Sequence, residues 1–153
     1  MSKTNVFELD ILKFIFNSVP LPTFGSIYIS LHTEINQPGF SALEIVGTQT
    51  YNEINVPRKA MPRDAATWEI SATTPYYVSL VSDVDFAEVV GGFWRATAIA
   101  VGTEETGDGK VLYYTDSRYY PPFTTTVIFV GPKTVVTLDA DTRFYEREEL
   151  GTL

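Results

Sequence analysis

The sequence predicts a mainly β protein, an antiparallel β-sandwich or barrel-like domain with an N-terminal α-helix. Residues 5–17 combine a helical spacing of apolar residues with a helix-start signal. Most of the remaining chain consists of short alternating or β-branched runs separated by Gly- and Pro-containing turn signals, a pattern typical of antiparallel folds. The chain has 153 residues, which is enough for one domain with its own core.

The N-terminal helix is predicted from its ends and from its apolar face. Asn5, followed by Glu8 three residues later, resembles a capping box, and Asn17 followed by Pro20 and Pro22 marks the end. The apolar face contains Phe7, Ile11, Phe14 and Ile15, and is widened by Leu9, Leu12 and Phe16. Because this face is so wide, we expect it to be buried on the protein's own sheet or on a neighbouring subunit.

Strands are expected over most of the chain that follows. Residues 26–33 alternate between an aliphatic face, with Ile27, Ile29 and Leu31, and a face with Tyr28, Ser30 and His32. Further strands are predicted at 67–72, 76–81, 83–89 and 93–101. Two hairpins are predicted, one over 102–114 with its tip at 107–109, and one that joins 124–130 to 133–139 through Gly131 and Pro132.

The domain organisation follows from these elements. We expect one domain, residues 1–153, in which 1–22 form the helix and a linker and 23–140 form the β domain. A long loop-like stretch at 34–63 is interrupted by prolines and glycines, and a connection of this length is usually functional or contains short elements. The tail at 141–153 is charged and has room for a helical turn.

Composition excludes several kinds of function. The chain has no cysteine, so disulfides, thiolate catalysis and Cys-ligated zinc are excluded. The formal net charge is −8 and the Lys and Arg residues are scattered, so we expect no nucleic-acid partner. No apolar run approaches the roughly 18 residues that span a bilayer, so no membrane partner is expected.

His32 is the only histidine, so it is the one candidate for a triad base, and a His-rich metal site is excluded. A general base and a metal ligand are both considered, but no nucleophile motif is present to partner it. We therefore interpret His32 as a polar residue near a strand end that makes a hydrogen bond. No catalytic residue, cofactor or metal ligand is assigned.

Carboxylates cluster at three places, which are Asp83 and Asp85 with Glu88 nearby, Asp139 with Asp141, and Glu104 and Glu105 with Asp108. Such clusters could bind calcium or act in glycoside cleavage. Because no EF-hand-type loop is present, we interpret them as solvated turn carboxylates and keep calcium at one of them as the alternative.

Aromatic residues are numerous and often adjacent, at 76–77, 93–94, 113–114 and 119–123. Neighbouring residues of a strand point to opposite faces, so one ring of each pair can fill the core while the other faces outward. The outward rings could form a protein interface, complete a core or bind carbohydrate. We expect an interface built from Phe7, Ile11 and Phe14 of the helix, Phe40 and Tyr51 of 34–63, and Arg118, Tyr119, Tyr120 and Phe123.

Six segments follow one another in a distinctive order, "SKTNVFELDILKFIF", "GSIYISLHT", "GTQTYNE", Trp68-x-Ile70-Ser71, "ATAIAVGT" and "GDGKVLYY". From Ser2 to about Thr137 this ordered set resembles a family of small tailed-bacteriophage virion structural proteins, whose members are commonly labelled tail fibre proteins. The sequence departs from the family in the proline-containing segment after "NE", and in a longer charged tail after Asp139. The resemblance implies a structural role and supplies no catalytic residues.

We therefore expect a non-enzymatic structural protein of a phage virion, assembled in the cytoplasm of the bacterial host. A capsid decoration or cement protein is favoured over a tail-associated or tail-fibre protein, because a compact acidic domain without repeats is not an elongated fibre. The expected partners are the major capsid protein or tail proteins, together with further copies of the chain in a homo-oligomer. A carbohydrate-binding receptor module and a glycan hydrolase are kept as alternatives.

Overall fold

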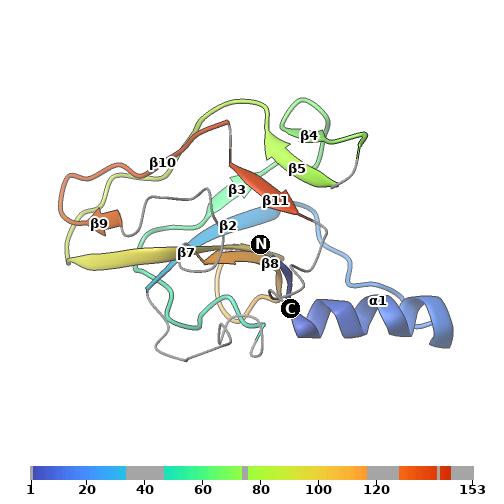
Figure 1. Ribbon diagram of the computed structural model, residues 1–153. Helices are drawn as coiled ribbons and strands as arrows, with labels where there is room; N and C mark the ends of the chain where they lie inside the picture. Colours follow the sequence, from blue (N-terminus) through green and yellow to red (C-terminus); the bar gives the residue numbers. More distant parts are fainter. Residues whose placement is uncertain (1, 34–46, 74–75, 117–127, 141, 146–153) are drawn as a thin grey trace, which may run out of the picture.

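The computed structural model describes residues 2–33, 47–73, 76–116, 128–140 and 142–145 (Figure 1). Over these residues the protein is mainly β, with antiparallel sheets and one helix at the N-terminus, which confirms the predicted fold class. The elements are β1 (Ser2–Lys3), α1 (Asn5–Asn17), β2 (Ile27–Thr33), β3 (Lys59–Met61), β4 (Trp68–Ile70), β5 (Tyr77–Leu80), β6 (Val84–Asp85), β7 (Trp94–Gly102), β8 (Val111–Asp116), β9 (Ile128–Val130), β10 (Thr137–Leu138) and β11 (Arg143–Tyr145).

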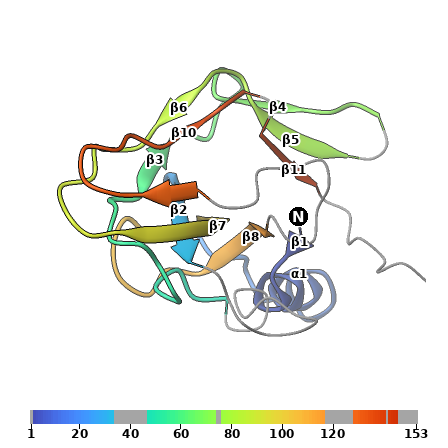
Figure 2. The same cartoon turned by 60° about the vertical axis from the view of Figure 1, so that its left-hand side comes forward.

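The main sheet has the strand order β1-β8-β7-β2-β3, and β9 pairs with the first residues of β7. Two smaller units, β11-β5-β4 and β10-β6, form a second layer over one face of this sheet (Figures 1 and 2). The largest apolar cluster lies between the layers, with Ile29 and Leu31 of β2 below and Leu80, Phe86 and Leu138 above. This arrangement is sandwich-like, as the sequence indicated.

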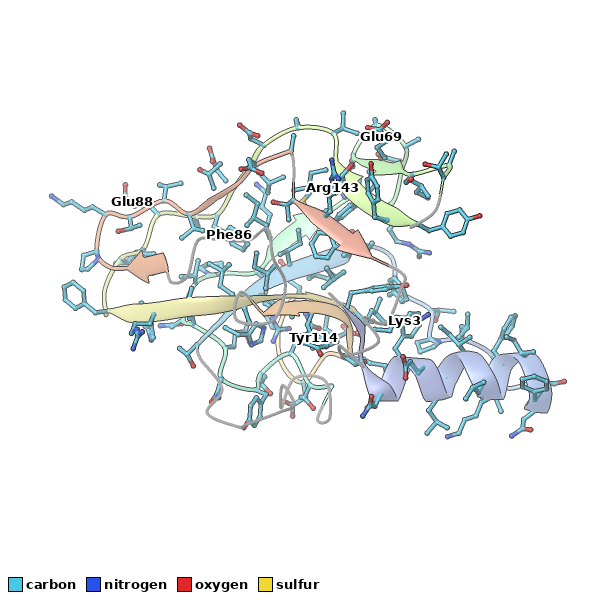
Figure 3. The ribbon with its side chains drawn as sticks, in the orientation of Figure 1. Lys3, Glu69, Phe86, Glu88, Tyr114 and Arg143 are labelled. Carbon is cyan, nitrogen blue, oxygen red and sulfur yellow. The ribbon has the colours of Figure 1, made fainter. Side chains whose placement is uncertain are left out.

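The opposite face of the main sheet is also covered. Figure 3 shows Phe86 on one side of the sheet and Tyr114 on the other. Tyr114 packs with Ala98 and Ala100 of β7, and residues 47–58 run across this face. The predicted alternation of residues 26–33 is therefore correct, but the polar side chains Ser30 and His32 are as deeply buried as the aliphatic ones.

One end of α1 agrees with the prediction and the other does not. The helix ends at Asn17 as expected, and Ser18 follows in the left-handed conformation with φ 56°. The N-cap, however, is Thr4 and not Asn5. The Thr4 hydroxyl oxygen accepts a hydrogen bond from the Phe7 backbone N–H at 3.2 Å and donates one to the Val111 carbonyl at 2.6 Å. Thr4 is the N-cap because β1 places it on the main sheet, where its hydroxyl has the Val111 carbonyl as a second partner.

Of the two predicted hairpins, β7–β8 is confirmed and the second is wrong. Residues 131–134 do form a tight turn, in which the Thr134 N–H donates to the Gly131 carbonyl at 3.0 Å. The chain then leaves the main sheet for the second layer, where β10 pairs with β6. Both β-branched runs thereby place a side chain, Val130 and Val136, in the same core from opposite layers, which a hairpin within one sheet would prevent.

The C-terminal part also differs from expectation. Arg143–Tyr145 form β11, which pairs with β5 and buries Phe144, so the expected tail begins with a strand. Residues 146–153 lie outside the described part of the chain.

Candidate functional site

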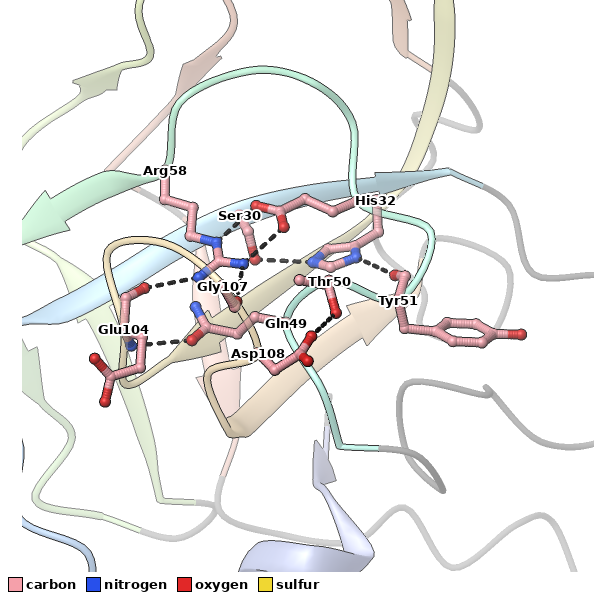
Figure 4. A network of polar contacts seen from close by, with 10 residues as sticks. Ser30, His32, Gln49, Thr50, Tyr51, Arg58, Glu104, Gly107 and Asp108 are labelled. Atoms are coloured by element: carbon pink, nitrogen blue, oxygen red, sulfur yellow. Dashed lines mark hydrogen bonds and ion pairs between the residues drawn. The ribbon is translucent and has the colours of Figure 1, made fainter.

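His32 lies at the centre of a buried polar network (Figure 4). Its Nδ1 lies 2.7 Å from the Tyr51 carbonyl oxygen and its Nε2 lies 2.8 Å from the Ser30 hydroxyl. Because a carbonyl can only accept, Nδ1 carries the proton and Nε2 accepts from Ser30. Burial lowers the pKa of His32 from 6.5 to about 4, although the bond to Tyr51 opposes this change. His32 is therefore neutral at physiological pH, and its full burial keeps it from any substrate.

Arg58 fastens the 47–58 segment to the turn between β7 and β8. Its Nε and one terminal nitrogen donate to the two carboxylate oxygens of Glu53, at 2.7 and 2.8 Å. The terminal nitrogens also donate to the carbonyls of Glu104, at 2.9 Å, and Gly107, at 2.7 Å. The guanidinium thus has four contacts, and the paired, two-pronged geometry with Glu53 is the strong form of this ion pair.

Gln49 completes the network between two glycines. Its Oε1 accepts from the Glu104 N–H at 3.0 Å, and its own backbone N–H donates to the Gly109 carbonyl at 2.8 Å. A Cβ atom at Gly102 or at Gly109 would overlap the Gln49 side chain. The segments "GTQTYNE", "ATAIAVGT" and "GDGKVLYY" therefore meet in space as one structural unit.

The carboxylates also make structural contacts. Asp83 accepts from the Ala140 N–H at 2.9 Å, and Asp85 accepts from the Thr137 hydroxyl at 2.5 Å, so both tie β6 to the β10 region. Within the described residues, no group of three or more acidic or histidine side chains is placed to hold a metal ion. Asp141 lies outside the described residues. In the same part of the chain, no helix is long enough to cross a membrane.

A groove of about 710 Å³ opens between the β11-β5-β4 sheet and the end of the main sheet near α1. Its lining is mostly apolar and comprises Ile27, Arg63, Asp64, Ala65, Trp68, Ile70, Tyr76, Tyr77, Val78, Val101, Tyr113 and Phe144. Trp68 and Phe144 meet edge to face with ring centroids 6.1 Å apart, and the Trp68 indole N–H donates to the Pro62 carbonyl at 2.7 Å. At the rim, the Arg143 guanidinium lies 4.6 Å from the centre of the Tyr77 ring.

The helix α1 lies beside this groove, and its contacts with the other described residues are near its start. Phe7 packs edge to face on Tyr113, with ring centroids 5.8 Å apart, and Asp10 forms an ion pair with Lys110 at 2.5 Å. Figure 1 shows the rest of the helix extending away from the body of the protein. None of its side chains is buried, and Phe16 is 77% exposed. Of the two expected ways to bury the apolar face, packing on the protein's own sheet is therefore limited to the start of the helix, and burial on a neighbouring subunit stays a prediction.

The residues expected at an interface have different positions. Phe7 and Ile11 are half-buried, and Phe14 is exposed. Tyr51 packs on the cluster around Tyr114, so it belongs partly to the core. The other expected interface residues, Phe40, Arg118, Tyr119, Tyr120 and Phe123, lie outside the described residues.

The groove was not anticipated, although adjacent aromatics gave part of the signal. Tyr76 and Tyr77 both line the groove; Tyr76 is 55% exposed and Tyr77 is half-buried. Trp68 and Phe144 come from distant strands, and their meeting depends on the pairing of both β4 and β11 with β5.

A scan against protein-family models finds no match for this sequence, and a search of curated proteins finds none either.

Proposed function

We propose that this chain is a non-enzymatic structural protein of a tailed-bacteriophage virion, and that it acts by docking on other subunits through α1 and the groove beside it. The observation that carries the assembly role is a helix with an apolar surface that the protein leaves in solvent. Exposed apolar patches of several hundred Å² mark interaction sites, because covering them removes apolar area from water. The virion context rests on the ordered set of segments that resembles the phage family.

The placement of the polar side chains supports a role without catalysis. His32, Glu53 and Arg58 are used in contacts that fix residues 47–58 on the sheet. Asp83 and Asp85 are used between β6 and the β10 region. The groove, by contrast, is lined mainly by apolar side chains, which offer few charged groups to stabilise a polar transition state.

Within the particle, we place the chain on the outer surface of the head as a decoration or cement protein. The net charge of −8 opposes a position that lines a DNA-filled cavity. A subunit that binds only the assembled lattice stabilises it by mass action, and contacts to two neighbours add avidity. A tail-associated position is the alternative, favoured by the label that the resembling family commonly carries.

The test is to locate the chain in purified phage particles by mass spectrometry and by immunogold electron microscopy with antibodies against it. We expect the chain in gradient-purified particles, with gold over the heads. Gold over the tails would replace decoration by the tail-associated alternative and keep the virion role. Absence of the chain from infectious particles would overturn the proposal.

A further inference from the structure

We infer that α1 of one copy of this chain docks in the apolar groove of a second copy, and that the second copy returns the same contact, so that the chain forms a two-fold symmetric dimer. This inference rests on the proposed function, because it identifies a second copy of the chain as one of the subunits on which α1 docks. The described residues provide both halves of such a contact, a helix with exposed apolar side chains and a groove of matching chemistry.

The helix is apolar around most of its circumference. One side carries Phe14 and Ile15, and the other carries Leu9, Leu12 and Phe16, while Asp10, Lys13 and Asn17 share a narrow strip between them. A helix that is apolar on nearly all sides is normally buried. The exposed large side chains of α1 present apolar area on the order of 600 Å², above what scattered surface residues would give.

The groove has the size and chemistry to receive such side chains. Its volume of about 710 Å³ is in the range of pockets that enclose a ligand, and aromatic and aliphatic residues form its walls. Ile70 at its edge is 72% exposed although it is a large apolar residue on a strand. If a helix covered the groove, Ile70 and Tyr76 would be buried, and so would the apolar side chains of that helix.

The helix cannot reach the groove of its own chain while its first turns are anchored. The Thr4 cap is bonded to Val111, Phe7 lies on Tyr113, and Asp10 is paired with Lys110. These contacts direct the helix away from the body, as Figure 1 shows. The same anchors hold the helix ready for a partner, so less conformational freedom is lost when it docks.

A second copy of the chain can cover the apolar side chains of α1 and the groove at the same time. Tyr113 lines the groove and also contacts Phe7, so the groove and the helix form one continuous apolar surface. A two-fold axis would bury this surface twice, for a total on the order of 1,500 Å², which is in the standard range for a stable interface. The contact closes on itself and leaves no helix unpaired, as closed symmetry requires. The net charge of −8 opposes association, so salt should strengthen the dimer.

The test is the oligomeric state of the full-length chain, measured by light scattering after size exclusion and by sedimentation velocity. The wild type should have twice the monomer mass of 17.1 kDa. Leu12→Ser/Phe16→Ser removes the docking helix face, and Ile70→Ser/Tyr76→Ser removes the groove edge. Both variants should be folded monomers whose melting temperature, unlike that of the wild type, does not rise with protein concentration. Phe93→Ser, at an 84% exposed position at the other end of β7, should remain a dimer.

Mixing the two monomeric variants gives the sharpest result, because one has an intact groove and the other an intact helix. We expect the mixture to associate through this single contact, more weakly than the wild type. A wild type that stays monomeric at all concentrations, a helix variant that still dimerises, or a mixture that does not associate would each overturn the inference. If the chain is a monomer but is present in phage particles, the dimer is wrong and the proposed function stands. If the chain is a dimer but is absent from particles, the proposed function is wrong and the dimer stands.

Discussion

The side chain of Gln49 lies against Gly102, so closely that a Cβ atom at position 102 would overlap it. Gly109 bounds the same side chain on another side. Neither glycine has a positive φ, so the absence of a side chain, and not backbone freedom, is what these positions require. This contact joins residues 47–58 to the β7–β8 hairpin and thereby completes the second buried face of the main sheet.

Gly102→Ala should lower the free energy of unfolding by about 2–3 kcal/mol, because the new methyl group must displace a buried side chain. Gly91→Ala is the matched control, since nothing lies within 4 Å of a Cβ built there. Urea unfolding of both variants measures the difference. In the double variant Gln49→Ala/Gly102→Ala, the shorter side chain at position 49 should remove part of the destabilisation caused by Gly102→Ala. Equal stability of the two glycine variants would contradict the packing described here.

His32 should make folding sensitive to acid. Its pKa is lowered from 6.5 to about 4 in the folded protein, so between these values the unfolded chain binds a proton that the folded chain does not. The stabilisation from a neutral His32 is complete above pH 6.5 and is lost as pH falls toward 4. Between pH 7.5 and 4.5 the loss should be about 2–3 kcal/mol.

The measurement is urea unfolding of the wild type and of His32→Gln at both pH values. His32→Gln should be less stable than the wild type at pH 7.5. From pH 7.5 to pH 4.5, however, its free energy of unfolding should fall by about 2–3 kcal/mol less than that of the wild type, because it has no His32 to protonate. The carboxylates titrate in both proteins and cancel in the comparison. Identical pH dependence in the two proteins would show that His32 is not held neutral.

Arg58→Lys should destabilise the protein by about 2–3 kcal/mol, because an ammonium group cannot reproduce the two-pronged pair with Glu53 together with the bonds to two carbonyls. The Arg58 side chain is only 4% exposed, so water cannot replace these partners. Arg63→Lys is the control: this exposed guanidinium donates to one carbonyl, of Phe24, and should cost at most about 1 kcal/mol. Equal melting temperatures for the two variants would contradict the role given to Arg58.

Thr4→Val should weaken the start of α1 by about 2 kcal/mol, since it removes the cap and leaves the Val111 carbonyl without its hydroxyl partner. Thr4→Ser keeps both bonds and should cost much less. Asn5→Ala distinguishes the observed cap from the one that the sequence indicated, and should change stability by less than about 0.5 kcal/mol. Far-UV circular dichroism and thermal melts report the result; a larger effect at Asn5 than at Thr4 would place the cap at Asn5.

Local patterns predicted much of the fold. The apolar spacing of residues 5–17 and the alternation of residues 26–33 placed α1 and β2 correctly, since both depend on neighbours in the chain. The capping error at Thr4 and the wrong hairpin at Gly131 have another cause. In each case a partner distant in sequence, Val111 or β6, decides the outcome.

The candidate site was predicted only in part. The width of the apolar stripe predicts that α1 needs a partner surface; Phe14 is exposed in the single chain, so that partner stays a prediction. The groove depends on Trp68, Tyr113 and Phe144 meeting from three strands, and no spacing in the sequence encodes that meeting. The burial of His32 likewise depends on residues 47–58 folding back across the sheet.

The most direct test of docking between copies is paramagnetic relaxation in solution. A nitroxide attached at Asn17→Cys, the only cysteine in that variant, marks the end of α1 in a copy without isotope label, which is mixed with isotope-labelled wild type. We expect broadening of the amide signals of Ile70, Val78 and Val101 in the isotope-labelled copy, and none of these effects from a nitroxide at Phe93→Cys. Unaffected groove signals with the Asn17→Cys label would contradict the claim that α1 docks in the groove of a second copy.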